Sequence, residues 1–165
     1  MKLKVIHYIK EIAFFFIVLT IFANLMSLYK SSNLNNTPLT ISSVDLLDKK
    51  SFLFNRDKPI LLHFWATWCP TCKLEASNID SIAQDFQVVT IAVKSGSDKE
   101  IQDFLDTHSL NFMVLNDRDA SFAHSFKISA YPTTFIYNKN RELVFSDVGY
   151  TSTWGLWLRM WWAGL

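Results

Sequence analysis

Both cysteines of this 165-residue chain lie in one stretch of eight residues, Trp65-Ala66-Thr67-Trp68-Cys69-Pro70-Thr71-Cys72. The residues just before it, 60–66 (ILLHFWA), form a nearly continuous apolar run, which is typical of a strand buried on both faces. The residues after it, from Pro70 to Phe86, repeat apolar side chains at helical spacing, and proline is well tolerated in a first helical turn. The sequence therefore predicts a central parallel strand that delivers two cysteines to the start of a helix.

The rest of the chain predicts alternating strands and helices. Its length suits one main domain, and half of its residues are hydrophobic, so a substantial core is feasible. The order predicts an α/β fold with a three-layer architecture, in which a mixed central sheet is mostly parallel with an antiparallel edge. The predicted elements are a short edge strand at 51–54, strands at 88–93 and 112–115, helices at 97–108 and 119–126, a hairpin from 133–137 and 142–145, and a closing helix at 151–162.

The N-terminal region predicts a membrane anchor. Lys2, Lys4 and Lys10 precede a run without charged residues over 12–29, which is close to the ~20 residues that span a bilayer. A cleaved signal peptide and a buried core helix are the alternatives. The lysines predict a cytoplasmic N-terminus at 1–11 and a periplasmic remainder. The polar segment 30–38 is predicted to be a linker, and residues 39–165 are predicted to form the folded domain.

The cysteine pair has a redox interpretation and two alternatives. Cys69 is expected at the helix N-terminus, where unpaired N–H groups and the helix dipole favour a thiolate, and Cys72 lies one turn further in. A structural disulfide is a weak alternative because so short a loop removes little unfolded-state entropy. A metal site would need further ligands, and the histidines show no paired spacing. Redox chemistry is therefore favoured, with no metal and no cofactor.

The motif F-W-A-T-W-C-P-T-C at 64–72, with Tyr131-Pro132-Thr133 before a later strand, resembles the thioredoxin superfamily. It is most similar to the membrane-anchored TlpA-like branch, and to the ScsD-type suppressors of copper sensitivity within it. The resemblance covers about residues 39–165. It implies a cis peptide bond at Pro132, which would leave the backbone of Tyr131 available to an extended substrate. Trp68, Pro70, Thr71 and Tyr131 are the residues expected to contact the substrate.

Two ionisable residues near the motif are candidates for proton transfer. His63 stands where thioredoxin has a buried aspartate that is thought to deprotonate the second cysteine, and a histidine that merely fills the core is the alternative. Glu75 matches an acidic residue of the TlpA-like branch. On a helix, it would share a face with Cys72 and assist its deprotonation. A solvated helix glutamate is the alternative.

The aromatic residues give two further predictions. Trp68 is expected to be exposed beside the cysteines and Trp65 to be mainly packing. Near the C-terminus, Trp154, Trp157, Leu158 and Trp161 form one stripe of a helix. We expect this stripe to pack against the sheet, the alternative being a face for a membrane interface or a partner.

The predicted function is that of a thiol–disulfide oxidoreductase of the bacterial inner membrane, with its catalytic domain in the periplasm. Resemblance implies that it reduces protein disulfides and is recharged by a membrane donor of the DsbD or ScsB type. The alternatives are a copper- or metal-handling thiol protein, a DsbE-type cytochrome c maturation reductase and a redox-inert assembly factor. A net charge of +1 with scattered basic residues argues against nucleic acid as a partner.

Overall fold

A computed structural model of the chain describes residues 8, 10–15, 17–19, 21–22, 25–26, 34, 37–47 and 50–165. Its strands are β1 (Ser43–Asp45), β2 (Ser51–Leu53), β3 (Ile60–Trp65), β4 (Gln87–Val93), β5 (Val114–Asp117), β6 (Thr133–Tyr137) and β7 (Leu143–Val148). Its helices beyond residue 37 are α2 (Pro70–Asp85), α3 (Asp98–Thr107), α4 (Ser121–Ser125) and α5 (Thr153–Ala163).

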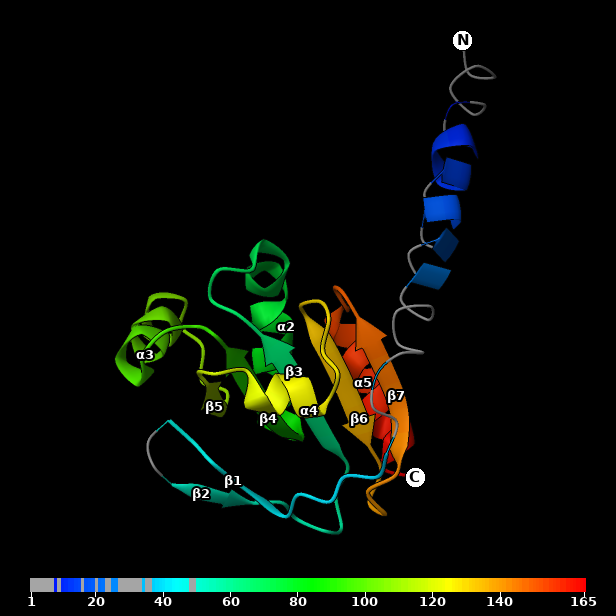
Figure 1. The fold of residues 1–165 in the computed structure, drawn as a ribbon. Coiled ribbons are helices and arrows are strands. Elements are labelled where there is room, and N and C mark those ends of the chain that lie inside the picture. Colours follow the sequence, from blue (N-terminus) through cyan, green and yellow to red (C-terminus); the bar gives the residue numbers. More distant parts are fainter. Residues whose placement is uncertain are drawn as a thin grey trace.

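The main sheet has five strands in the order β5-β4-β3-β6-β7 (Figure 1). The strands β3, β4 and β5 run parallel, whereas β6 is antiparallel to β3 and β7 is antiparallel to β6. Every residue of β3 and β4 is buried, as expected for the central strands of a covered sheet. The predicted thioredoxin-like α/β architecture with a mixed sheet is confirmed.

Two hydrophobic cores cover the two faces of this sheet. Leu61 and Trp65 of β3 pack with residues of α2, α3 and α5 on one face. Ile60, Leu62 and Phe64 pack with α4 and with the N-terminal part of the domain on the other. Because side chains alternate along a strand, His63 points to the same face as Leu61 and Trp65, which is the face that α2 covers.

Three of the helices, α2, α3 and α5, begin directly after a residue whose side chain caps the helix. Pro70 is the first residue of α2, after the N-cap Cys69. Ser97 caps α3 and forms a capping box with Glu100. The Ser152 hydroxyl caps α5 by accepting a 3.3 Å hydrogen bond from the N–H of Gly155.

The short edge strand predicted at 51–54 is present as β2, which pairs with β1 in a two-stranded sheet separate from the main one (Figure 1). One strand prediction differs from the structure. The strand expected at 112–115 lies at 114–117 instead. Its first predicted residue, Phe112, lies before the strand and contacts Trp65 edge-on in the core, with 5.7 Å between the ring centroids.

The prediction that the tryptophan stripe of α5 packs against the sheet is wrong. Trp154, Trp157, Leu158 and Trp161 are all exposed. The buried stripe of α5 consists of Leu156, Met160 and Ala163. These also recur at helical spacing, so α5 is apolar on both faces and periodicity alone could not choose between them.

The predicted anchor at 12–29 and the linker at 30–38 fall partly outside the described residues. The residues described between 8 and 26 are helical, and those from 12 onward are exposed. None of the helices that the described residues form is both long and apolar enough to cross a membrane. Leu34 is buried in the core on the α4 side of the sheet, so the chain contacts the domain before residue 39.

Candidate redox site

The two cysteines form a disulfide at the N-terminus of α2. Their Cα atoms are 5.3 Å apart. Cys69 is 5% exposed and Cys72 is 1% exposed, so the first cysteine is the more accessible of the two. The Sγ atom of Cys69 accepts a hydrogen bond of 3.2 Å from the backbone N–H of Cys72. In the reduced state this N–H and the helix dipole would stabilise a thiolate on Cys69.

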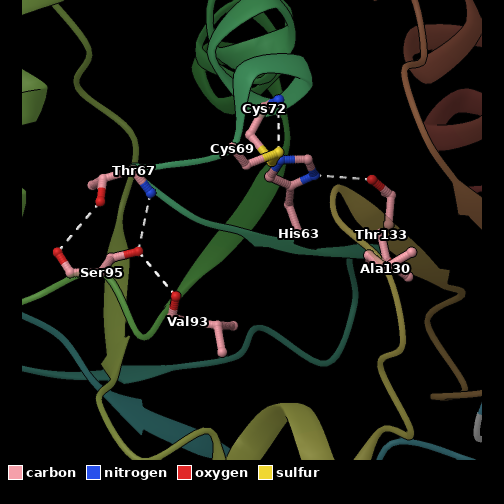
Figure 2. The surroundings of a disulfide bond; sticks show 9 residues. His63, Thr67, Cys69, Cys72, Val93, Ser95, Ala130 and Thr133 are labelled. Carbon is pink, nitrogen blue, oxygen red and sulfur yellow. Dashed lines mark hydrogen bonds between the residues drawn. A yellow bond between two sulfur atoms is a disulfide. The ribbon is translucent and has the colours of Figure 1, made fainter.

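The loop before Cys69 is held against the end of β4 (Figure 2). The N–H of Thr67 donates to Ser95 Oγ at 3.1 Å, and Ser95 Oγ in turn donates to the Val93 carbonyl at 3.1 Å. Trp68 Nε1 donates to the carbonyl of Lys94 at 3.1 Å. These bonds fix the loop that carries Cys69, so the position of its sulfur depends on two adjacent parallel strands.

An aromatic pair lies beside the disulfide. Trp68 is exposed and Trp65 is buried, as predicted. The Trp68 ring meets Tyr131 edge-on, with 5.7 Å between ring centroids and an interplanar angle of 89°. The peptide bond between Tyr131 and Pro132 is cis, as the family resemblance implied. Exposed aromatic surface around a reactive sulfur is suited to contact with a protein substrate.

His63 is buried beneath the disulfide face of the sheet. Its Nδ1 lies 2.9 Å from Thr134 Oγ1, on the residue directly opposite in β6. Figure 2 shows its ring turned toward the disulfide. Burial lowers the pKa of His63 to about 3, so the imidazole is neutral at pH 7. A charged imidazolium is therefore disfavoured here, and the neutral ring is a weak base that forms a hydrogen bond with Thr134.

Glu75 is fully buried on α2, which excludes the solvated alternative. Its Oε1 accepts a 2.9 Å hydrogen bond from the N–H of Thr151, and its Oε2 has no partner among the described residues. Burial raises the pKa of Glu75 to about 8, the Thr151 bond opposes this rise, and the charge of Asp147 adds to it. At neutral pH the carboxyl group is mostly protonated and can exchange a proton close to physiological conditions.

Sequence reasoning missed the partners of both ionisable groups. Thr134 meets His63 only because β3 and β6 pair in this register, and Thr151 meets Glu75 only because α5 packs beside α2. Nothing in the sequence near His63 or Glu75 marks these threonines. The described residues contain no group of three or more His, Cys, Asp or Glu side chains that could hold a metal ion.

The chain matches a known protein family and is similar to several thiol–disulfide oxidoreductases. Residues 39–146, more than half of the chain, match the model of the AhpC/TSA family. A "Thioredoxin-like protein" of Haemophilus influenzae is 34% identical over 133 residues, covering 76% of this chain and 78% of the relative. The "Thiol:disulfide interchange protein DsbE" of the same organism is 31% identical over 96 residues, covering 56% of this chain and 53% of the relative. A solved structure of a secreted Mycobacterium tuberculosis disulfide oxidoreductase, described as homologous to DsbE of E. coli, has a TM-score of 0.62 at 26% identity, covering 72% of this chain and 92% of the other.

Proposed function

This chain belongs to the AhpC/TSA family within the thioredoxin superfamily and is a thiol–disulfide oxidoreductase, and we propose that it reduces protein disulfides while tethered to a membrane. The observation that carries the proposal is the Cys69–Cys72 disulfide at the N-terminus of α2, with the N–H of Cys72 directed at the sulfur of Cys69. An inert disulfide would not need a helix N-terminus that stabilises its reduced form.

The reaction begins with the reduced dithiol. The Cys69 thiolate attacks one sulfur of a client disulfide, which forms a mixed disulfide and releases the other client sulfur as a thiolate. The Cys72 thiolate then attacks Cys69 Sγ and releases the second client sulfur. The client gains two electrons and two protons, and the enzyme is left with the Cys69–Cys72 disulfide. Because Cys72 is more deeply buried than Cys69, it is suited to the second, intramolecular attack.

We propose that Glu75 or His63 accepts the proton that Cys72 loses. Cys72 must lose its proton before it can attack, and the site holds few groups that can take it. Glu75 lies one turn from Cys72 on the same helix, and an acid whose pKa is about 8 is close to half-ionised under mildly alkaline conditions. The ring of His63 faces the disulfide, which makes it the second candidate, but a ring whose pKa is about 3 is a much weaker base than Glu75.

Exposed side chains around the disulfide are proposed to bind the client. Trp68, Pro70 and Thr71 are next to Cys69 along the chain, and Tyr131, which precedes the cis Pro132, contacts the ring of Trp68. Trp68 and Pro70 are exposed, whereas Thr71 and Tyr131 are half-buried, so the surface is shallow. A shallow surface with an exposed indole suits an extended segment of a client protein better than a small molecule.

The membrane tether is proposed from the apolar run at 12–29, with residues 1–11 in the cytoplasm, 30–38 as a linker and 39–165 as the domain. In support, all of the described residues of this run are helical, and their large apolar side chains are exposed. This arrangement places the domain in the bacterial periplasm, where disulfides persist and a membrane donor of the DsbD or ScsB type can return electrons. Such a donor makes the protein a reductant of the ScsD type.

A DsbE-type role in cytochrome c maturation is the second candidate. It is favoured by the 31% identity to DsbE of Haemophilus influenzae, although the match spans only 53% of that protein. The connection between β4 and α3 is short, from Lys94 to Ser97, and leaves no room for the acidic insertion that DsbE-type proteins usually carry. A copper-binding role for the same two thiols would appear as tight stoichiometric Cu(I) binding without disulfide turnover.

Insulin reduction tests the proposal. The wild-type chain should reduce insulin disulfides with a thiol donor, and Cys69→Ser should abolish this activity because it removes the attacking sulfur. Cys72→Ser serves as the matched variant, since it retains the attack but blocks release and should accumulate mixed disulfides with clients. Identification of the trapped clients by mass spectrometry separates the two candidates. Full activity in Cys69→Ser would refute the mechanism.

A further inference from the structure

The connecting segment between β7 and α5, residues 149–153, contacts two parts of the redox site. At its start, the N–H of Gly149 donates to the carbonyl of the cis-proline Pro132 at 2.8 Å. Two residues later, the N–H of Thr151 donates to Glu75 Oε1 at 2.9 Å. Gly149 has a φ of +105°, which favours glycine and turns the chain out of β7 toward α2. The connecting segment therefore joins the proline loop to the buried acid.

The side chain of Asn78 holds the connecting segment in place. Its Nδ2 donates to the Thr151 carbonyl at 3.0 Å and to the Tyr150 hydroxyl at 3.1 Å. Its Oδ1 accepts a 3.0 Å hydrogen bond from the Thr153 hydroxyl. Asn78 is half-buried on α2, three residues after Glu75, and residues at this spacing are neighbours on a helix surface. One side chain thus binds three residues of the segment that contacts Glu75.

This arrangement makes the two carboxyl oxygens of Glu75 unequal. The backbone of Thr151 is held from α2 at both its carbonyl, by Asn78, and its N–H, by Oε1. In contrast, Oε2 is buried and has no hydrogen-bond partner among the described residues. Buried polar atoms are usually paired, so an unpaired carboxyl oxygen one helical turn from Cys72 is suited to proton exchange.

The other charged groups around Glu75 come from three elements. His63 of β3 is neutral at pH 7, and Asp147 of β7 pairs with Arg159 of α5, with 3.1 Å between Oδ2 and Nε. The strands β4 and β6 add no ionisable residue on this face, since Tyr137 packs in the opposite core. Beyond the rise due to burial, the backbone hydrogen bond lowers the pKa of Glu75 and the charge of Asp147 raises it. The connecting segment and Asp147 therefore act on Glu75 in opposite directions.

We propose that Asn78 is a positioning residue for the proton transfer that accompanies client release. By holding the connecting segment, it fixes Glu75 Oε1 on the Thr151 N–H and leaves Oε2 to take the proton of Cys72. The S–H bond of Cys72 breaks, an O–H bond forms at Oε2, and the new thiolate attacks Cys69 Sγ and releases the client thiolate. This inference rests on the role of Glu75 proposed above.

Carboxyl NMR of the oxidised full chain in detergent tests the contact directly. The chain has four glutamates, and the signal of Glu75 is the one that Glu75→Gln removes. In the wild-type chain this signal should titrate with a pKa of about 8. Asn78→Ala frees the Thr151 N–H from its fixed position, so the midpoint should move to higher pH. Asp147→Asn removes the neighbouring negative charge and should move the midpoint to lower pH.

Two further variants control this measurement. Ser77→Ala removes an exposed hydroxyl at the adjacent position of α2 and should leave the Glu75 midpoint unchanged. Thr153→Val removes only the hydroxyl that donates to Asn78 Oδ1, so it should move the midpoint in the same direction as Asn78→Ala but by less. Because it nearly keeps the shape of the side chain, it decides the question if Asn78→Ala does not fold.

The pH dependence of client release tests the functional part of the proposal. The reduced full chain is mixed with a peptide disulfide, and acid quenching with mass spectrometry follows the decay of the mixed disulfide. In Asn78→Ala, decay at pH 7 should slow by up to about tenfold, because a hydrogen bond to the charged carboxylate is lost. The rate should recover at higher pH, where Glu75 is ionised. A variant that is merely damaged would be slower at every pH.

Two results would overturn the proposal, and they are distinguishable. An unchanged Glu75 midpoint in both Asn78→Ala and Thr153→Val refutes the positioning by Asn78, whatever the rate of client release. A shifted midpoint with unchanged client release refutes proton transfer by Glu75, and the role of Asn78 with it. Insulin reduction by the wild-type chain and by Cys69→Ser tests the oxidoreductase activity separately from both.

Discussion

The opposite pKa shifts of Glu75 and His63 predict an unusual dependence of stability on pH. Burial raises the pKa of Glu75 from 4.5 to about 8, so between these values the folded chain binds a proton that the unfolded chain has lost, and stability falls as pH rises. Burial lowers the pKa of His63 from 6.5 to about 3, so between these values the unfolded chain binds the extra proton, and stability rises with pH. The two slopes cancel between pH 4.5 and 6.5, and only the fall due to Glu75 remains above pH 6.5.

The magnitudes follow from about 1.4 kcal/mol per pH unit for each group. From pH 6.5 to 8 the free energy of unfolding of the oxidised wild-type chain should fall by about 2 kcal/mol. Glu75→Gln removes the titrating group and keeps an oxygen that can accept the Thr151 N–H, so its stability should be flat over this window. From pH 4.5 to 6.5 the free energy of unfolding of the wild-type chain should not change, whereas that of Glu75→Gln should rise by roughly 3 kcal/mol.

Urea unfolding of the oxidised chain in detergent, followed by tryptophan fluorescence, measures these curves. Asp103→Asn is the control, since it removes one exposed acidic charge from α3. Glu75→Gln should also slow the release of client from Cys69 by up to about 100-fold at pH 7, the lower end of what a positioned acid or base contributes. A more stable but slower enzyme would mark Glu75 as a functional residue. Parallel wild-type and Glu75→Gln curves above pH 6.5 would refute the reasoning.

Two further substitutions test the surroundings of the site. Thr134→Val keeps the shape of the side chain but leaves Nδ1 of His63 without its partner, so the free energy of unfolding should fall by about 1–3 kcal/mol in urea titrations; no loss would mean that the 2.9 Å contact is not a stabilising hydrogen bond. Trp68→Ala removes the exposed indole beside Cys69 and should lower kcat/KM for a protein client by roughly 30-fold, the effect of losing an interface residue worth ~2 kcal/mol. A small disulfide should react as before, and an equal loss with both substrates would contradict a docking role for Trp68.

The sequence alone determined the framework of the fold and the position of the cysteines. The apolar runs that became β3 and β4 have no polar face, so they had to be central strands, and Pro70 fitted only the first turn of the helix that follows. These features are local, because they depend on side chains within a few residues of one another. The helix predicted at 97–108 is likewise local: α3 begins at Asp98 after its N-cap Ser97, and a capping box is complete within four residues.

Only the tertiary structure decided the properties that depend on packing between distant segments. Both stripes of α5 are apolar, and the sheet selected Leu156, Met160 and Ala163 as the buried one, which left the tryptophans exposed. Likewise, Glu75 and His63 are ordinary titratable residues in the sequence. Their pKa values move because α5 covers one of them and β6 faces the other, and desolvation depends on the whole surrounding structure rather than on neighbours along the chain.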